Sequence, residues 1–327
     1  MQQPSPSKKL PRTTDVKRSS SRQQRQETPT LQSVILLQPL LFGELLSFLP
    51  TRSIAALCRA FQVCRTAREV LADEAQWTRF MTQHCPVDWS ATKNLGALNP
   101  HETSLGCRAL EDYVSLRWQL EGFGGLVEVV KGDIGTITHV GDVAIDCLVF
   151  PTSHSFMNPH VGVAARVHER AGPSLDREVV HLRFSDYVTP GSVMATAGYD
   201  SGMRLLVHCA GPYATRTTEA DRTLYKTYVE ALTAVHNSNV TCAAVASIST
   251  GLMGFPYDRA APIALAAVRD MMRAKRNWRT KVAFVCFEDE GFTQFEQTKR
   301  DIMLRLHADA FDYPDVLAYN ADDDDNN

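Results

Sequence analysis

The segment SISTGLMGFP, residues 247–256, combines small hydroxyl side chains with two glycines, between an apolar run and a helical pattern. Gly251 and Gly254 allow the backbone to approach a ligand closely. The amides that follow open a helix, whose dipole favours an anion at that end. Ser249 and Thr250 add short hydroxyl donors. The segment therefore favours a phosphate or diphosphate ligand, although many strand-to-helix turns with two glycines hold none.

The composition is that of a globular protein without a strong charge bias. The chain of 327 residues is 44% hydrophobic and 22% charged, and its 34 basic and 37 acidic residues give a net charge of −3. This balance argues against direct nucleic-acid binding, because little positive charge is in excess to neutralise phosphates. No apolar run reaches the roughly 18 residues that span a bilayer, so no membrane contact is expected.

The cysteines and histidines form no recognisable metal site. No C-x-x-C pair occurs, and His84 and Cys85 beside Cys58 and Cys64 match no common zinc spacing. Free thiols of this kind indicate a reducing compartment, so a cytoplasmic and/or nuclear protein is expected. We expect no cofactor and no metal.

Strand and helix patterns alternate through the C-terminal half. Near-continuous apolar runs indicate strands in residues 126–134, 145–152, 191–199, 204–211, 241–248 and 281–287. Between some of them, helical patterns occupy residues 162–172, 220–237 and 258–275. Such an alternation predicts an α/β fold with a largely parallel sheet covered on both faces. Ligands of such sheets bind outside the carboxyl ends of the strands, where residues 247–256 are expected to lie.

Several motifs occur in an order that resembles the macro domain family. GDI follows the first strand, ATAGY and LLVHCAGPY come later, and SISTGLMGFPYDRAA and VAFVCFEDE follow in turn. The resemblance covers residues 126–304 and implies a three-layer α/β/α domain over about residues 124–308, with a mixed, largely parallel sheet. It also implies a domain that binds ADP-ribose and, in some members, removes it from proteins.

The resemblance assigns roles to residues that match the family's motifs. Asp133 corresponds to the acidic residue that accepts a hydrogen bond from the adenine amino group, with the Ile134 amide beside it. Phe287 and Phe292 are candidates for the wall of the adenine pocket, and a core position is equally compatible with Phe287. The second phosphate loop corresponds to Ser249, Thr250, Gly251, Leu252, Met253, Gly254 and Phe255, with Phe255 near the distal ribose. Framework positions are expected at Tyr199, His208 and Pro212.

The first phosphate loop departs from the family's pattern. The two asparagine positions fall on Phe150 and Ser153, and the acidic position that follows Gly162 and Val163 falls on Ala164. The family's glycine run is replaced by NPHVG, in which proline donates no amide and histidine carries a Cβ. Ser153, Gly162 and Val163 therefore remain candidates for ligand contact, whereas Ala164 cannot activate a water molecule.

Hydrolysis would require a replacement acid or base. His154, His160 and Asp258 are the available side chains, and His160 is the best candidate because an unperturbed histidine titrates near physiological pH. A loop histidine without catalytic duty is the competing interpretation, so we assign no catalytic residue.

The N-terminal third is helical in pattern. Pro39 can start a helix, and Leu41, Leu45, Leu46 and Leu49 recur on one predicted face. Residues 37–80 resemble the F-box, a helical motif that docks a substrate receptor onto a cullin-type ubiquitin ligase through its adaptor. The expected partner-binding residues of this F-box-like domain, residues 31–82, are Leu45, Leu46, Leu49, Pro50 and Trp77. A helical extension that packs on the next domain is the alternative.

The remaining segments are expected to connect or flank these domains. Residues 1–30 and 309–327 read as a basic and an acidic disordered tail. Residues 83–123 form a connector with a helix over residues 107–120, and Gly122, Gly124 and Gly125 are expected to mark the domain boundary.

Three functions are compatible with the sequence. The leading one is a monomeric reader that binds ADP-ribose or mono-ADP-ribosylated protein and is coupled to a ubiquitin ligase. The second is an ADP-ribosyl hydrolase, acting on protein mono-ADP-ribose or O-acetyl-ADP-ribose, with a rearranged site. The third is a degenerate macro scaffold that binds protein and no nucleotide.

Overall fold

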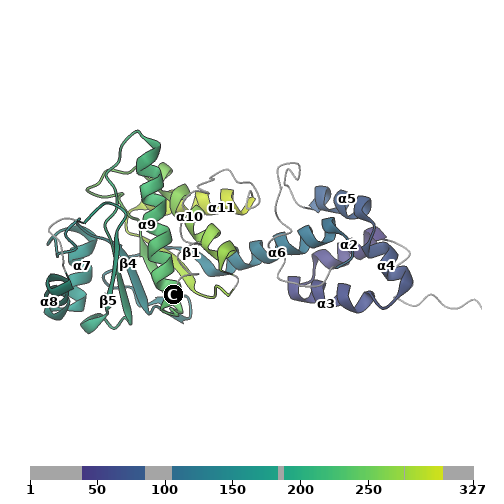
Figure 1. Cartoon of the computed structure of the whole chain (residues 1–327), viewed down its shortest axis with the longest axis horizontal. Coiled ribbons are helices and arrows are strands. Elements are labelled where there is room, and N and C mark those ends of the chain that lie inside the picture. The colour runs from purple at the N-terminus through teal and green to yellow at the C-terminus, as the bar shows by residue number, and fades with distance from the viewer. Residues whose placement is uncertain (1–38, 85–104, 183–187, 276, 305–327) are drawn as a thin grey trace, which may run out of the picture.

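The computed structural model describes residues 39–84, 105–182, 188–275 and 277–304. Two groups of elements are joined by one long helix, α6 (Arg108–Leu126), as Figure 1 shows. The described helices include none that combines the length and apolar character needed to cross a membrane. The expected tails at residues 1–30 and 309–327 lie outside the described residues.

The larger group is built on a six-stranded sheet in the order β1-β8-β7-β4-β6-β5. Neighbouring strands are parallel except at one edge, where β5 runs antiparallel to β6. All six expected strands are confirmed, and so is the mixed, largely parallel sheet. The strands are β1 (Val127–Lys131), β4 (Cys147–Pro151), β5 (Val193–Ala197), β6 (Leu205–Cys209), β7 (Cys242–Ala246) and β8 (Lys281–Cys286).

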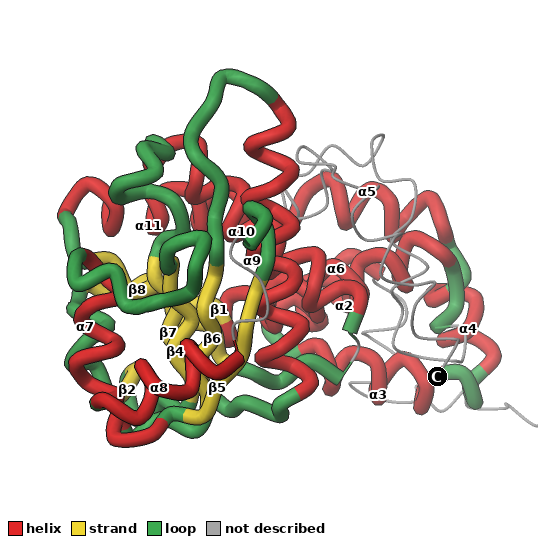
Figure 2. The backbone as a smooth tube through the Cα atoms, turned by 60° about the vertical axis from the view of Figure 1, so that its left-hand side comes forward, coloured by secondary structure: helices red, strands yellow, loops and turns green. Residues whose placement is uncertain are grey.

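Helices lie on both faces of this sheet (Figure 2). They cover both faces because the strands bury alternating side chains on each. In β4, Cys147 and Val149 belong to one apolar core, whereas Leu148 and Phe150 belong to the other. The first core is closed by α9 (Thr218–Asn237), α10 (Tyr257–Ala274) and α11 (Asp289–Leu304). The second core is closed by α7 (Gly162–Ala171), α8 (Pro173–Leu182) and a small hairpin of β2 (His139–Val140) with β3 (Val143–Ala144).

Within the described residues, the smaller group contains four helices, of which α3 and α5 pack directly against α6. They are α2 (Pro39–Ser47), α3 (Thr51–Phe61), α4 (Arg65–Leu71) and α5 (Glu74–His84). Leu46 and Trp77 are fully buried in its core, and the Trp77 ring packs edge-on against Phe42 and Phe80. Leu45 is 48% exposed, so the expected single apolar face is wrong at this position: Phe42, one turn before Leu46, fills the core instead.

The expected boundary at Gly122, Gly124 and Gly125 is not a break in the helix. α6 continues through these glycines to Leu126 and leads directly into β1. A Cβ at Gly124 would lie only 3.0 Å from Met303 Cε, and one at Gly122 would touch Met272 Cε at 3.7 Å. The glycines therefore let α6 approach α10 and α11 closely. Hydrophobic contacts on both ends make α6 a shared element of the two groups.

Candidate ligand-binding site

The loops that follow the parallel strands meet at one edge of the sheet. Five strands, β1, β8, β7, β4 and β6, run in the same direction, so the segments after them lie at the same carboxyl edge. This edge brings together Asp133 after β1, Ser153 after β4, residues 247–256 after β7 and Phe287 after β8. It is the edge at which ligands bind in sheets of this kind.

The loop after β7 is tightly closed by its own backbone. Phe255 N–H donates to the Ser249 carbonyl oxygen at 2.9 Å, and Gly254 N–H donates to the Gly251 carbonyl oxygen at 2.9 Å. Gly254 has φ 76°, a conformation that favours glycine. Ser249 adopts φ 67°, and its buried hydroxyl has no hydrogen-bond partner among the described residues. A ligand acceptor would satisfy such a hydroxyl.

Three of the edge loops touch one another around Gly211. A Cβ on Gly211 would collide with Ser249 Oγ, so the segment after β6 approaches the loop after β7 as only glycine permits. His154, from the loop after β4, forms a 2.8 Å contact from Nε2 to the Gly211 carbonyl oxygen. Thr152, nearby in the same loop, also has a buried hydroxyl without a partner in the described part of the chain. The centre of the edge is thus narrow and lined by hydroxyl groups.

The loop after β4 adopts a strained path. His160 has φ 56° and Phe156 has φ 56°, in the left-handed region that such residues rarely adopt. The backbone N–H of His160 donates to Asn158 Oδ1 at 2.9 Å, which closes the turn. The loop then enters α7, whose N-cap residue Val161 provides no side-chain cap for the first-turn amides.

The residues that the resemblance aligns with the family's reactive positions are Phe150, Ser153 and Ala164, and each is buried or engaged in local contacts. Phe150 is fully buried, and Ala164 is buried at 3% exposure in the same core. The Ser153 hydroxyl lies 2.9 Å from Ser155 Oγ and 3.3 Å from the carbonyl oxygen of Met157, which it can reach as a donor. Phe150 and Ala164 thus pack in the core, and the Ser153 hydroxyl contacts residues of its own loop. The expectation that this side lacks an acid or base at the family's position stays a prediction.

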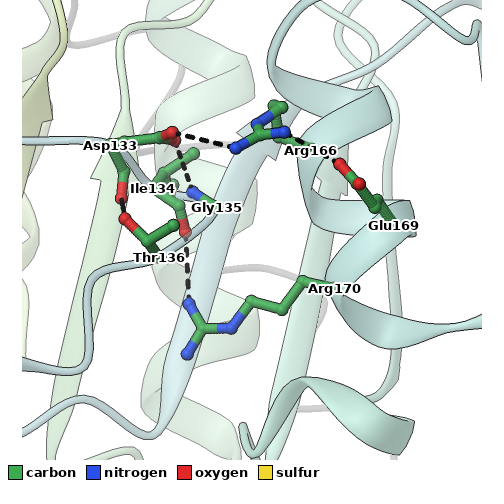
Figure 3. Close-up of polar contacts among 7 residues, drawn as sticks. All are labelled: Asp133, Ile134, Gly135, Thr136, Arg166, Glu169 and Arg170. Carbon is green, nitrogen blue, oxygen red and sulfur yellow. Dashed lines mark hydrogen bonds and ion pairs between the residues drawn. The ribbon is translucent and has the colours of Figure 1, made fainter.

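At the other end of the edge, Asp133 is held by two partners. Gly135 N–H donates to Asp133 Oδ1 at 2.8 Å, and Arg166 Nη2 lies 3.5 Å from Asp133 Oδ2 (Figure 3). The carboxylate remains 28% exposed, so a ligand can still reach it. Phe287 is 74% exposed, which excludes the core alternative for this ring and leaves it available at the same end.

Two arginines one helical turn apart on α7 hold the Asp133 loop. Arg170 Nη1 donates to the carbonyl oxygens of Ile134 at 3.3 Å and Ile137 at 2.9 Å, while Arg166 contacts the Asp133 carboxylate. Burial lowers the pKa of Arg170 from its ordinary value. Neither arginine was anticipated from the sequence. Their i, i+4 spacing was visible, but the partner loop lies far away in the chain.

Phe255 packs in the apolar core beneath the loop after β7. Its ring is 2% exposed in the core, with the Arg259 guanidinium 5.0 Å from the ring centroid. The expected position beside the distal ribose stays a prediction for this side chain, which is the last apolar residue before α10 and packs beneath the loop. Leu252 is 86% exposed at the loop tip, and Gly162 and Val163 start α7 at the same edge.

Below the loop after β4 lies a buried pair of histidines. The His168 and His208 ring centroids are 5.8 Å apart, and His168 Nδ1 lies 2.5 Å from Asp176 Oδ1. His208 is in contact with Thr196 Oγ1 at 3.1 Å through Nε2. Burial, with a smaller effect of His168, lowers the pKa of His208 to about 3. The framework role expected for His208 fits a neutral imidazole in the core.

Among the residues that the structure describes, no group of three or more histidine, cysteine or acidic side chains is arranged to hold a metal ion. The described cysteines are all free, and most of them are buried. Cys85 lies outside the described residues.

Fold and site together define a three-layer α/β protein with loops suited to an anionic ligand at the carboxyl edge of its sheet. The family model described as "Macro domain" matches residues 152–264. An O-acetyl-ADP-ribose deacetylase of Shigella dysenteriae is 30% identical, over 52% of this chain and 93% of the relative. The chain therefore belongs to the macro domain family.

Two further similarities concern the same half of the chain. A protein of Thermoplasma acidophilum, described only as uncharacterized, is 32% identical over 50% of this chain and 84% of its own length. The macrodomain of Oceanobacillus iheyensis, solved with ADP, is 25% identical with a TM-score of 0.49, over 54% of this chain and 91% of that one. The N-terminal helices lie outside the residues that the family model matches.

Proposed function

We propose that the protein binds ADP-ribose, free or attached to a protein, at the carboxyl edge of the sheet. The observation that carries the proposal is the loop after β7, where the buried Ser249 hydroxyl has no partner in the described chain and Gly254 adopts a left-handed conformation. α10 follows with no side-chain cap on its first turn. A diphosphate would supply acceptors for these donors.

The other features of the edge support the same ligand. Asp133 is a partly exposed acceptor for an amino group, and Phe287 offers an exposed ring at the same end of the site. The relative named O-acetyl-ADP-ribose deacetylase acts on a derivative of this nucleotide, as its name states. We infer a reader rather than an enzyme, because Ala164 is an apolar core residue and the Ser153 hydroxyl is engaged within its own loop.

Calorimetric titration of the full chain with ADP-ribose tests the proposal. We expect micromolar affinity, about −8 kcal/mol, that weakens at least about tenfold in Asp133→Ala, because a hydrogen bond to a charged acceptor is lost. Asp142→Ala is the matched control, since Asp142 is exposed in the turn between β2 and β3. No heat at millimolar ligand would overturn the proposal and favour a protein-binding scaffold.

The second candidate function is hydrolysis of O-acetyl-ADP-ribose or of an ADP-ribosyl ester on protein. The name of the deacetylase relatives favours it. The candidate base is His160, which is exposed just before the N-terminus of α7. The test is acetate release from O-acetyl-ADP-ribose by the full chain and by His160→Ala. Turnover by the full chain that disappears in the variant would support an enzyme. Binding of the nucleotide without turnover would support a reader.

We further propose that the helices of residues 39–84 attach the reader to a ubiquitin-ligase adaptor, as an F-box does. Leu45 is 48% and Phe48 82% exposed at the end of α2, which leaves an apolar surface for a partner. Leu46 and Trp77 are buried and can support this surface only from within. Co-purification with the adaptor should be lost in Leu45→Asp and kept in Val63→Asp, a control at another exposed apolar residue. If both variants co-purify with the same amount of adaptor, the proposal fails. The alternative, a helical extension that packs on the macro domain, would then be favoured.

A further inference from the structure

Arg166 is the one charged side chain of α7 that the structure places against the carboxylate of Asp133 within the described residues. Its Nη2 is 3.5 Å from Asp133 Oδ2, and its Nη1 donates to Glu169 Oε2 at 2.9 Å (Figure 3). The guanidinium thus lies between two carboxylates, beside the group that is proposed to accept the adenine amine.

The Cβ of Arg166 packs closely against the Asp133 loop, whereas its side chain remains accessible to solvent. A Cβ on Gly135 would lie 3.0 Å from Arg166 Cβ and 3.1 Å from Asp133 Oδ1, so the glycine lets the arginine pack directly on the loop. The Arg166 side chain is nevertheless 51% exposed. Arg170 differs, because its guanidinium is committed to the backbone carbonyl oxygens of the loop. Arg170 holds the loop in place, and Arg166 presents its charge at the surface.

The contacts of Arg166 can be exchanged for contacts with a ligand at small cost. A guanidinium has five N–H donors, and the two ion pairs of Arg166 involve only its terminal nitrogens. The pair with Glu169 is solvent-exposed and the pair with Asp133 is partly exposed, and ion pairs that water can reach contribute little to stability. Donors therefore remain for an acceptor placed next to the Asp133 carboxylate.

Adenine presents such an acceptor beside its amino group. Its N6 amine is a donor and the neighbouring N7 an acceptor, so a carboxylate and a guanidinium side by side match this edge of the base. We propose that Arg166 is a specificity-determining residue, which donates to adenine N7 while Asp133 accepts from the N6 amine. The inference rests on the proposed function, because it takes ADP-ribose as the ligand.

An analogue of ADP-ribose with carbon in place of adenine N7 isolates this contact. The wild-type chain should bind the analogue about tenfold more weakly than ADP-ribose, because the acceptor for a charged donor is missing. Arg166→Ala should bind ADP-ribose about tenfold more weakly than the wild type does, and should bind the analogue no worse than ADP-ribose. This loss of discrimination is specific to the proposed contact, and a general distortion of the loop would not produce it.

Glu169→Gln is the matched control, because it removes the charge of the other partner of Arg166 and leaves Arg166 beside Asp133. Its affinity for ADP-ribose should stay at the wild-type value, and urea unfolding should confirm that both variants are folded. Equal discrimination against the analogue in wild type and Arg166→Ala, or tighter binding of ADP-ribose by Arg166→Ala, would overturn the inference while the proposed function stands. Absence of ADP-ribose binding by the wild type would instead remove the proposed function, and the inference with it.

Discussion

The loops after β7 and β4 occupy equivalent places but are built differently. Each leaves a buried strand at the carboxyl edge and leads into a helix whose N-cap residue, Pro256 or Val161, supplies no side-chain cap. The loop after β7 adopts left-handed conformations at Gly254 and Ser249, whereas the loop after β4 adopts them at His160 and Phe156 as well as Gly162. Both loops therefore combine a left-handed glycine with left-handed residues that carry a side chain, one such residue in the loop after β7 and two in the loop after β4.

The layers beneath the two loops also differ, because only one of them contains a buried histidine. β7 is buried along its whole length, and the Tyr228 hydroxyl accepts a hydrogen bond from Ile248 N–H at 2.8 Å at the start of its loop. β4 rests on a layer that contains a histidine, since the Phe150 and His208 rings lie 4.6 Å apart. The two loops thus rest on different layers, one on a fully buried apolar strand and the other on a layer that contains a buried histidine.

The largest expected effect is a loss of folding stability in acid, caused by His208 in the layer beneath the loop after β4. The pKa of His208 is lowered to about 3 by burial, so below pH 6.5 the unfolded chain binds a proton that the folded chain does not. Stability from this group is complete above pH 6.5 and is lost as the pH falls toward 3. At pH 5 the loss is about 2 kcal/mol. Urea unfolding at pH 7 and pH 5 measures it.

The matched variant for this prediction is His208→Leu, which places an apolar side chain in the layer and removes the titrating group. The difference in unfolding free energy between pH 7 and pH 5 should be smaller in the variant by about 2 kcal/mol. His208→Gln provides a second comparison in case leucine packs poorly. If all three proteins lose the same stability between the two pH values, His208 is protonated at no cost and the polar layer is not the weaker support.

The next effect tests whether the loop after β7 depends on its glycine. Gly254→Ala should lower the unfolding free energy by about 1 kcal/mol, because φ 76° disfavours a side chain and the nearest atom to a new Cβ is 4.0 Å away. Gly251→Ala is the control: its φ is ordinary and a Cβ there meets open space, so stability should stay or rise by about 0.5 kcal/mol. Chemical denaturation measures both changes in unfolding free energy. A loss in Gly254→Ala alone supports the dependence on this glycine, and an equal loss in both variants contradicts it.

Much of this fold can be predicted from local patterns. Short runs of Val, Ala and Ile between glycine, proline and aspartate predicted every strand of the main sheet, since fully buried parallel strands require such runs. The position of residues 247–256 at the ligand edge follows from the same alternation. The two-residue strands β2 and β3, and the helices α8 and α11, were not predicted.

What the sequence did not predict depends on contacts between distant segments. Gly122 and Gly124 looked like breaks, but packing against Met272 and Met303 keeps them in α6. Phe255 looked like a ligand contact, yet the core beneath the loop covers its ring. The contact between Arg166 and Asp133 could not be predicted from the sequence, because it depends on how closely α7 approaches the loop after β1. Local periodicity carries no information on such pairings.

The smallest expected effect tests the strain in the loop after β4. His160→Gly should raise the unfolding free energy by about 0.5 kcal/mol, because relief of φ 56° outweighs the greater freedom of glycine in the unfolded chain. The control is His139→Gly, the same change at an exposed strand position, where about 0.5 to 1 kcal/mol should be lost. Thermal and urea unfolding of both variants give the signs. A loss in both would mean that the His160 ring makes stabilising contacts that offset its backbone strain, and the two loops would then differ in sequence but not in strain.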